Sequence, residues 1–218
     1  MLQIETVAPA TFDLLRRLQS EELLGTTRLV GGTSLALQMG HRTSVDLDLF
    51  SFEKFDSQRV QELLFEKYGF TPNLVTANTI IGFSEGVKID IIYHPFKWID
   101  SIITENGVRL SSTKEIAAMK LHAIINSGQR PKDFVDLAFL SQKYSYNQML
   151  SFLLEKYPQY DPMLANRSIN YFGDIDKNKI PEILMIGYKL DWARVEKRLL
   201  QITKKPDEVF PTEFLKSV

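Results

Sequence analysis

The segment from Leu29 to Ser51, LVGGTSLALQMGHRTSVDLDLFS, constrains this chain most because it joins a glycine turn to two closely spaced acids. Its pattern predicts a strand, a turn, a short helix and a second strand. Gly31 and Gly32 let the backbone approach a ligand closely. Thr33 and Ser34 open a helix whose N–H groups and dipole favour an anion such as phosphate. The alternative is a strand-to-helix turn capped by a hydroxyl, which is the more common meaning of such a run alone.

The two acids of this segment are Asp46 and Asp48, which alternate with Val45, Leu47 and Leu49. A strand with this alternation places both carboxylates on one face. Close carboxylates repel unless a cation lies between them, and oxygen ligands suit Mg²⁺ or Mn²⁺. The alternative is the solvated polar face of an edge strand.

A third acid, Asp90, lies in the apolar run from Val87 to Tyr93, which is typical of a central strand. If this strand lies beside that of Asp46 and Asp48, three carboxylates converge and can hold two divalent ions, as phosphoryl transfer requires. The alternative is a structural ion pair of Asp90 with Lys88 or Arg42.

Composition removes several other classes of function. The 218 residues contain no cysteine and carry a net charge of -1, so disulfide scaffolds, thiolate metal sites and a general electrostatic coating for nucleic acid are excluded. The glycine turn lacks the ending of a P-loop, and the three histidines lack the spacing of a zinc site. No apolar run reaches the length of a membrane span, and we expect a cytoplasmic protein without membrane contact.

The chain changes character near residue 110. Residues 1–110 are expected to form an α/β domain and residues 111–218 a helical domain that completes a cleft, because domain junctions favour ligand sites. The expected strands are 27–30, 45–50, 79–83 and 87–93. The expected helices are 8–24, 57–68, 113–126, 133–143, 146–156 and 192–202.

The helix expected from residue 113 carries one unusual lysine. Ser112 and Glu115 form a capping-box pattern that starts this helix. Lys120 lies one turn from Ile116 and Ile124, so its ammonium is on or beside an apolar face and needs an anion. The functional interpretation is contact with a triphosphate, and the alternative is a lysine whose stem packs while its head stays in water.

Basic and acidic residues alternate after this helix. Arg130 and Lys132 add positive charge, and Asp133 and Asp136 follow at helical spacing. The cluster can bind phosphates while its acids orient the basic groups, or Asp133 can simply complement the helix N-terminus.

Taken in order, these motifs resemble the DNA polymerase β-like nucleotidyltransferase superfamily. The block from Ser111 to Leu140 is similar to that of the AbiEii/AbiGii-type toxins of type IV toxin–antitoxin systems. The resemblance implies a polymerase β-like α/β domain with a mixed sheet, followed by a helical C-terminal domain. It implies that Asp46, Asp48 and Asp90 are catalytic metal ligands. The nucleotide-binding residues that it implies are Gly31, Gly32, Thr33, Ser34, Lys120, Lys132, Asp133 and Asp136.

The resemblance also implies an activity. The expected enzyme uses Mg²⁺ or Mn²⁺ to move a nucleoside monophosphate from an NTP to RNA, at the 3′ end of tRNA, and a cognate antitoxin restrains it. Ser127 departs from the pattern, because an arginine commonly occupies that place, and Arg130 is a nearby substitute. The alternatives are a nucleotidyltransferase that acts on a small hydroxylated molecule and a catalytically silent nucleotide-binding or interaction module.

Overall fold

The computed structural model describes residues 1–211 and 213–215, and the chain divides into two compact units. The first unit contains Met1–Gly40 and Ser44–Ser112, and the second contains His41–Thr43 and Thr113–Val218. Residues 212 and 216–218 of the predicted second domain lie outside the described part. A division of the sequence at residue 110 does not anticipate that His41–Thr43 groups with the second unit.

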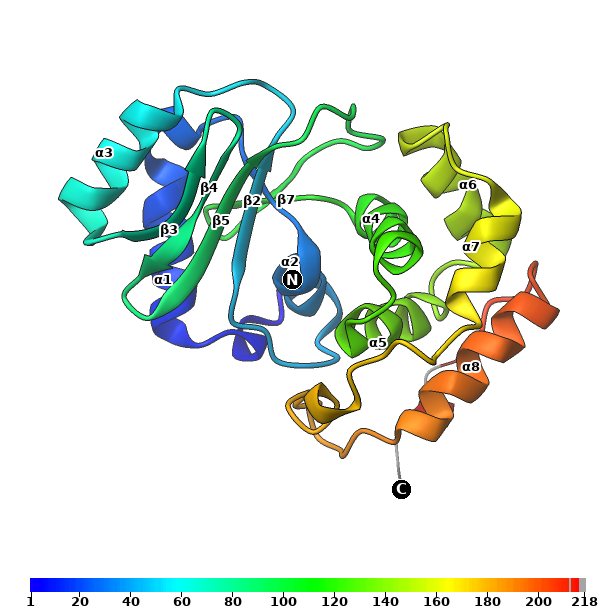
Figure 1. The fold of residues 1–218 in the computed structure, drawn as a ribbon. Coiled ribbons are helices and arrows are strands. Elements are labelled where there is room, and N and C mark those ends of the chain that lie inside the picture. Colours follow the sequence, from blue (N-terminus) through cyan, green and yellow to red (C-terminus); the bar gives the residue numbers. More distant parts are fainter. Residues whose placement is uncertain (212, 216–218) are drawn as a thin grey trace. The chain divides into compact units, whose positions relative to one another are not determined.

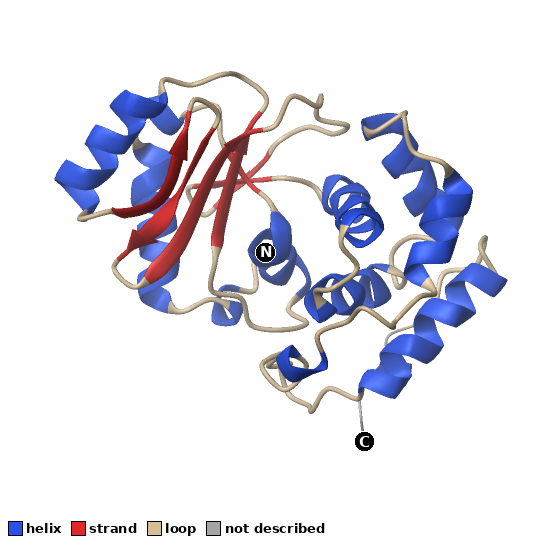
Figure 2. Cartoon of the chain, in the orientation of Figure 1, coloured by secondary structure: helices blue, strands red, loops and turns tan. Residues whose placement is uncertain are grey.

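The first unit is built on a seven-stranded sheet of order β3-β4-β5-β2-β1-β7-β6 (Figures 1 and 2). The pairs β2–β5 and β1–β7 are parallel and the other pairs are antiparallel, which confirms the expected mixed sheet. The strands are β1 Arg28–Leu29, β2 Leu47–Ser51, β3 Thr71–Thr76, β4 Thr79–Ser84, β5 Val87–Tyr93, β6 Ile103–Glu105 and β7 Val108–Leu110.

Three α-helices accompany this sheet, and α1 and α3 lie on one face of it with α2 on the other (Figure 1). Their bounds are α1 Pro9–Ser20, α2 Gly31–Met39 and α3 Ser57–Tyr68, with short 3-10 turns at Ile4–Thr6 and Glu22–Leu24. The main core contains buried leucines of α1 and α3 together with Leu47, Leu49, Ile89 and Ile91 of β2 and β5. Because side chains alternate along a strand, the even-numbered residues of β2 and β5 face away from this core.

Local signals explain why α3 has the bounds predicted for it. The carboxylate of Asp56 accepts hydrogen bonds from the N–H groups of Gln58 and Arg59, which caps the helix start. Gly69, with a φ of 57°, ends the helix in the left-handed conformation that glycine adopts without strain.

The described part of the second unit is helical, as expected. Its helices are α4 Thr113–Asn126, α5 Pro131–Leu140, α6 Tyr146–Lys156, α7 Pro162–Ile169 and α8 Trp192–Lys204, with 3-10 turns at Lys177–Lys179 and Glu213–Leu215. The predicted bounds of α4 and α6 are confirmed. A capping box of Ser145 and Gln148 starts α6, and Pro131 occupies the first turn of α5, which begins two residues before the predicted Asp133.

Several predicted elements have different bounds. The helix predicted over residues 8–24 is interrupted because Glu21 is extended, with a ψ of 134°. The strand predicted from Val45 begins at Leu47, so Asp46 lies just before it. Strands β3, β6 and β7 and helix α7 are not predicted from the sequence. Among the described residues, no helix combines the length and the apolar character needed to cross a bilayer.

Candidate functional site

Asp48 and Asp90 occupy matching positions on two neighbouring parallel strands. The register of β2 and β5 pairs Leu47 with Ile89 and Asp48 with Asp90. Because Leu47 and Ile89 belong to the core on one face, the two acids share the opposite face. The sheet therefore brings together two of the three acids that the sequence analysis selected.

The two oxygens of Asp90 have different surroundings. Oδ2 accepts a hydrogen bond of 2.6 Å from Nζ of Lys88, so the ion pair that was one alternative for Asp90 is present. Oδ1 is buried and has no hydrogen-bond partner among the described residues. A buried carboxylate oxygen without a partner is costly and is rare in folded proteins. Oδ1 is thus an open acceptor position in the site.

Asp48 lies directly against the turn that opens α2. Gly31 has a φ of +67°, and a Cβ added to it would stand 2.3 Å from Oδ2 of Asp48. The N–H of Val30 donates to the carbonyl of Asp48 over 2.9 Å, which keeps the turn beside β2. Only glycine fits here, both for its backbone conformation and for the space that the carboxylate occupies.

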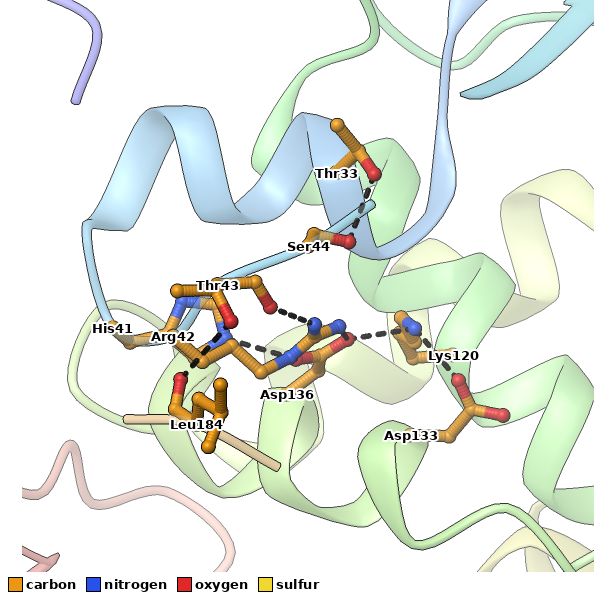
Figure 3. Close-up of polar contacts among 9 residues, drawn as sticks. All are labelled: Thr33, His41, Arg42, Thr43, Ser44, Lys120, Asp133, Asp136 and Leu184. Carbon is orange, nitrogen blue, oxygen red and sulfur yellow. Dashed lines mark hydrogen bonds and ion pairs between the residues drawn. The ribbon is translucent and has the colours of Figure 1, made fainter. Parts of the chain in front are cut away.

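The hydroxyls of Thr33 and Ser34 bond within the protein. Oγ1 of Thr33 donates to the carbonyl of Asp46 and lies 2.8 Å from Oγ of Ser44 (Figure 3). Oγ of Ser34 is buried, 3.4 Å from the carbonyl of Ser111 and 3.1 Å from Nε2 of Gln38. These side chains fix the chain around the turn. The main-chain N–H groups of the first turn of α2 are then the donors that a phosphate could use.

The acids do not form a metal cage by themselves. No group of three His, Cys, Asp or Glu side chains is gathered for a metal within the described ranges 1–211 and 213–215. Asp46 is partly exposed and precedes β2 by one residue. Mg²⁺ is commonly held by one or two carboxylates together with substrate phosphates and water. The Asp48–Asp90 pair, with the open Oδ1 of Asp90, fits that mode of binding.

The second unit contains a buried cluster around Asp136 (Figure 3). Oδ1 of Asp136 lies 2.8 Å from Nε2 of His41 and accepts from Nε of Arg42 over 2.7 Å. Oδ2 accepts from Nη2 of Arg42 over 2.9 Å and lies 2.7 Å from Nζ of Lys120. Burial alone would raise the pKa of Asp136, but the charges of Arg42 and Lys120 hold it well below its ordinary value. Arg42 and Lys120 therefore stabilise the ionised form of Asp136.

Lys120 neutralises two carboxylates of its own unit. Its ammonium lies 2.6 Å from Oδ1 of Asp133 in addition to its contact with Asp136, and Oδ2 of Asp133 lies 3.0 Å from Nε of Arg130. Burial would lower the pKa of Lys120, but the two acids raise it. The anions that the sequence pattern requires for Lys120 are thus Asp133 and Asp136. Lys132 is partly exposed and forms no ion pair with any described residue.

His41 and Arg42, which the sequence leaves open as substrate contacts or as an exposed polar turn, are buried members of this cluster. Arg42 is also considered from the sequence as a partner of Asp90, yet it pairs with Asp136, which is 94 residues away along the chain. No local pattern reports a contact of that separation. Burial, more than the opposing effect of Asp136, lowers the pKa of His41, and its Nδ1 has no partner among the described residues. A buried polar pair such as His41-Arg42 needs a counter-charge. That rule predicts an acidic partner only once the pair is known to be buried.

Comparisons with known proteins agree with this fold. The family model described as "Nucleotidyl transferase AbiEii toxin, Type IV TA system" matches residues 13–69 and 81–210. The uncharacterized protein aq_aa25 of Aquifex aeolicus (strain VF5) is 30% identical over 152 residues, which are 67% of this chain and 73% of that protein.

Two crystal structures resemble the chain in fold. A candidate nucleotidyltransferase from H. pylori has a TM-score of 0.53 and 18% identity, and the match covers 91% of this chain and 95% of that one. JHP933 from Helicobacter pylori has a TM-score of 0.52 and 16% identity, with 91% and 92% covered. At these identities the likeness establishes the shared fold.

Proposed function

The chain belongs to the AbiEii family of nucleotidyltransferase toxins of type IV toxin–antitoxin systems, and from this premise we propose that it moves a nucleoside monophosphate from an NTP to an acceptor hydroxyl. In this reaction the acceptor oxygen bonds to the α-phosphorus, the bond to the bridging oxygen breaks, and pyrophosphate leaves with its electron pair.

One observation carries the proposal. Asp48 and Asp90 are level on adjacent strands, and Asp90 keeps a buried oxygen, Oδ1, without a hydrogen-bond partner among the described residues. Two carboxylates on one face repel each other, and an open buried acceptor atom is costly. A divalent cation bound between the two acids would relieve both costs. Mg²⁺ or Mn²⁺ bound there would neutralise charge on the transferring phosphate and lower the pKa of the attacking hydroxyl.

The residues around these acids have separate roles in the proposal. Asp48 and Asp90 hold the cation, and Asp46 is an additional ligand from the segment just before β2. In the proposal the carboxylate of Asp90 also takes the proton of the acceptor hydroxyl. Gly31 and Gly32 give the backbone room to approach the phosphates, and the N–H groups of the first turn of α2 bind them. Thr33 and Ser34 hold this turn in place through their buried hydrogen bonds.

The second unit contributes a cationic group to the proposal. We assign phosphate binding to Lys132, because its ammonium is partly exposed and forms no ion pair with the described residues. Buried ion pairs of Lys120 with Asp133 and Asp136 hold α4 and α5 together. In the proposal these three residues support the nucleotide site indirectly, by positioning the two helices.

The acceptor in this proposal is RNA, at the 3′ end of tRNA, and the partner that restrains the enzyme is a cognate antitoxin. Membership of a type IV toxin family supports the antitoxin partner. The tRNA acceptor rests on the resemblance of the motifs between Leu29 and Leu140.

The proposal is tested by incubating the protein with Mg²⁺, total cellular RNA and each α-³²P-labelled NTP in turn. Asp48→Asn is the inactive comparison. Asp13→Asn is the matched control, because Asp13 is an exposed acid of the same unit that pairs with Arg17. The expected result is label in a tRNA-sized band with the wild type and with Asp13→Asn, and none with Asp48→Asn. Equal labelling by all three proteins would remove Asp48 from the reaction. Label in another molecule alone would replace RNA as the acceptor.

A further inference from the structure

Lys88 lies beside the two acids of the candidate site. It is on β5, two residues before Asp90, so both side chains are on the face that carries Asp48. Nζ of Lys88 lies 2.6 Å from Oδ2 of Asp90. Asp46 directly precedes Leu47, and Lys88 directly precedes Ile89, the partner of Leu47 across the two strands. The ammonium of Lys88 therefore lies among the predicted metal ligands.

We propose that Lys88 is a built-in counter-cation that competes with the divalent ion for Asp90 and so sets how much of that ion the site requires. The proposal rests on the proposed function, because it assumes a divalent ion at Asp48 and Asp90. In the absence of the ion, the ammonium of Lys88 neutralises Asp90. When the ion binds, the ammonium moves away from Oδ2 into water.

Burial and charge support this exchange. The side chain of Asp90 is 13% exposed, whereas that of Lys88 is 38% exposed, so the lysine can reach water and the acid cannot leave. A flexible four-carbon stem lets the ammonium move without moving β5. A divalent ion at Oδ1 and an ammonium at Oδ2 would place like charges on one carboxylate, where they repel. Binding of the ion is therefore weakened for as long as Lys88 stays.

The side chain of Lys88 also explains the state of Asp90 in this structure. Oδ2 is satisfied by the ammonium, and Oδ1 is left buried without a partner among the described residues. The lysine supplies one positive charge to Oδ2 and leaves Oδ1 open. The ion pair between Lys88 and Asp90 thus lowers the affinity of the site for the divalent ion.

The test is the affinity of the full-length protein for Mn²⁺ without nucleotide, measured from the electron paramagnetic resonance signal of free Mn²⁺. The variants are Lys88→Met, which removes the competing charge, and Lys88→Arg, which keeps it. The matched control is Lys67→Met, because Lys67 pairs with Glu21 over 2.9 Å in the same unit, away from Asp90 along the chain. Asp90→Asn reports whether the ion uses this acid at all.

We expect Lys88→Met to lower the Kd for Mn²⁺ by about tenfold or more, as removal of an adjacent like charge should. Lys88→Arg and Lys67→Met are expected to bind as the wild type does, and Asp90→Asn more weakly. If Asp90→Asn weakens binding but Lys88→Met matches the wild type within about twofold, the role of Lys88 is overturned and the metal site stands. If Asp90→Asn leaves Mn²⁺ binding unchanged, the metal site of the proposed function fails, and this inference fails with it.

Discussion

Gly31 and Asp48 approach so closely that no side chain fits between them, since a Cβ on Gly31 would stand 2.3 Å from Oδ2 of Asp48. The carboxylate of a strand residue and the backbone of a helix start are thereby fixed against each other. A helix start offers N–H groups to an anion, and a carboxylate offers oxygens to a cation. In the proposed reaction, this contact places the phosphate-binding helix start beside a carboxylate that holds the cation.

Gly31→Ala is predicted to disturb both stability and transfer. The left-handed conformation costs about 1–2 kcal/mol for alanine, and the added methyl group must also displace the carboxylate of Asp48. Gly86→Ala is the control, because Gly86 has a φ of +77° and nothing within 4 Å of its added Cβ. In urea unfolding, Gly86→Ala should lose only the free energy that the left-handed conformation costs. Gly31→Ala should lose more, because of the added clash with Asp48. The transfer rate should fall about 10–100-fold in Gly31→Ala alone, and equal rates in the two variants would refute the contact's importance.

Lys120 and Lys132 are predicted to respond differently to replacement by methionine. Lys120→Met leaves Asp133 and Asp136 buried with less compensation, so the free energy of unfolding should fall by about 3–5 kcal/mol. Lys132→Met should change stability by about 0.5 kcal/mol or less and should raise the KM for the NTP. Urea unfolding and steady-state kinetics measure the two effects. A stable Lys120→Met protein with a raised KM would show that Lys120, too, binds the phosphates directly.

The stability of the protein is predicted to fall as the pH decreases below about 6.5. Burial lowers the pKa of His41 from its ordinary value of 6.5, and burial likewise lowers that of His122. Below pH 6.5 the unfolded chain therefore binds protons that the folded protein does not, and the free energy of unfolding decreases. Each such histidine contributes a slope of at most about 1.4 kcal/mol per pH unit.

His41→Gln tests this assignment, because an amide N–H can still donate to Asp136 but does not titrate in this range. Urea unfolding between pH 5 and pH 7.5 should give a smaller slope for His41→Gln than for the wild type, with the contribution of His122 remaining. An unchanged slope would mean that His41 is protonated in the folded protein, beside Arg42 and Lys120 as well as Asp136.

The sequence predicts those elements whose signals are local. The helices Ser57–Tyr68, Thr113–Asn126 and Tyr146–Lys156 have the predicted bounds, and so does the strand Val87–Tyr93. The mixed α/β architecture followed by helices is confirmed as well. Strand β3 is missed because its residues are almost all exposed and include Pro72 and Asn73, which weaken a strand pattern. Strands β6 and β7 have three residues each, too few for a period to appear.

The candidate site is predicted in its residue types but not in its pairings. The sequence predicts Asp46 and Asp48 on one face and Asp90 on a central strand, and the register of β2 and β5 places Asp48 level with Asp90. Alternation cannot report that β2 begins after Asp46, nor that Lys120 and Arg42 both reach Asp136. Those contacts depend on how distant segments pack, and the sequence carries no periodic signal for them.

The central claim, that Asp48 and Asp90 act together in nucleotidyl transfer, is tested most directly by a double-mutant cycle. Transfer of label from an α-³²P-NTP to RNA is measured for Asp48→Asn, Asp90→Asn and the combined variant, with urea unfolding to establish that each is folded. When two residues act as one unit, the first substitution removes most of their joint contribution to the rate, and the second has little further effect. We predict that each single variant loses nearly all transfer and that the combined variant is no slower than the slower single one. Substantial transfer by either single variant, or losses that multiply in the combined variant, would contradict the account.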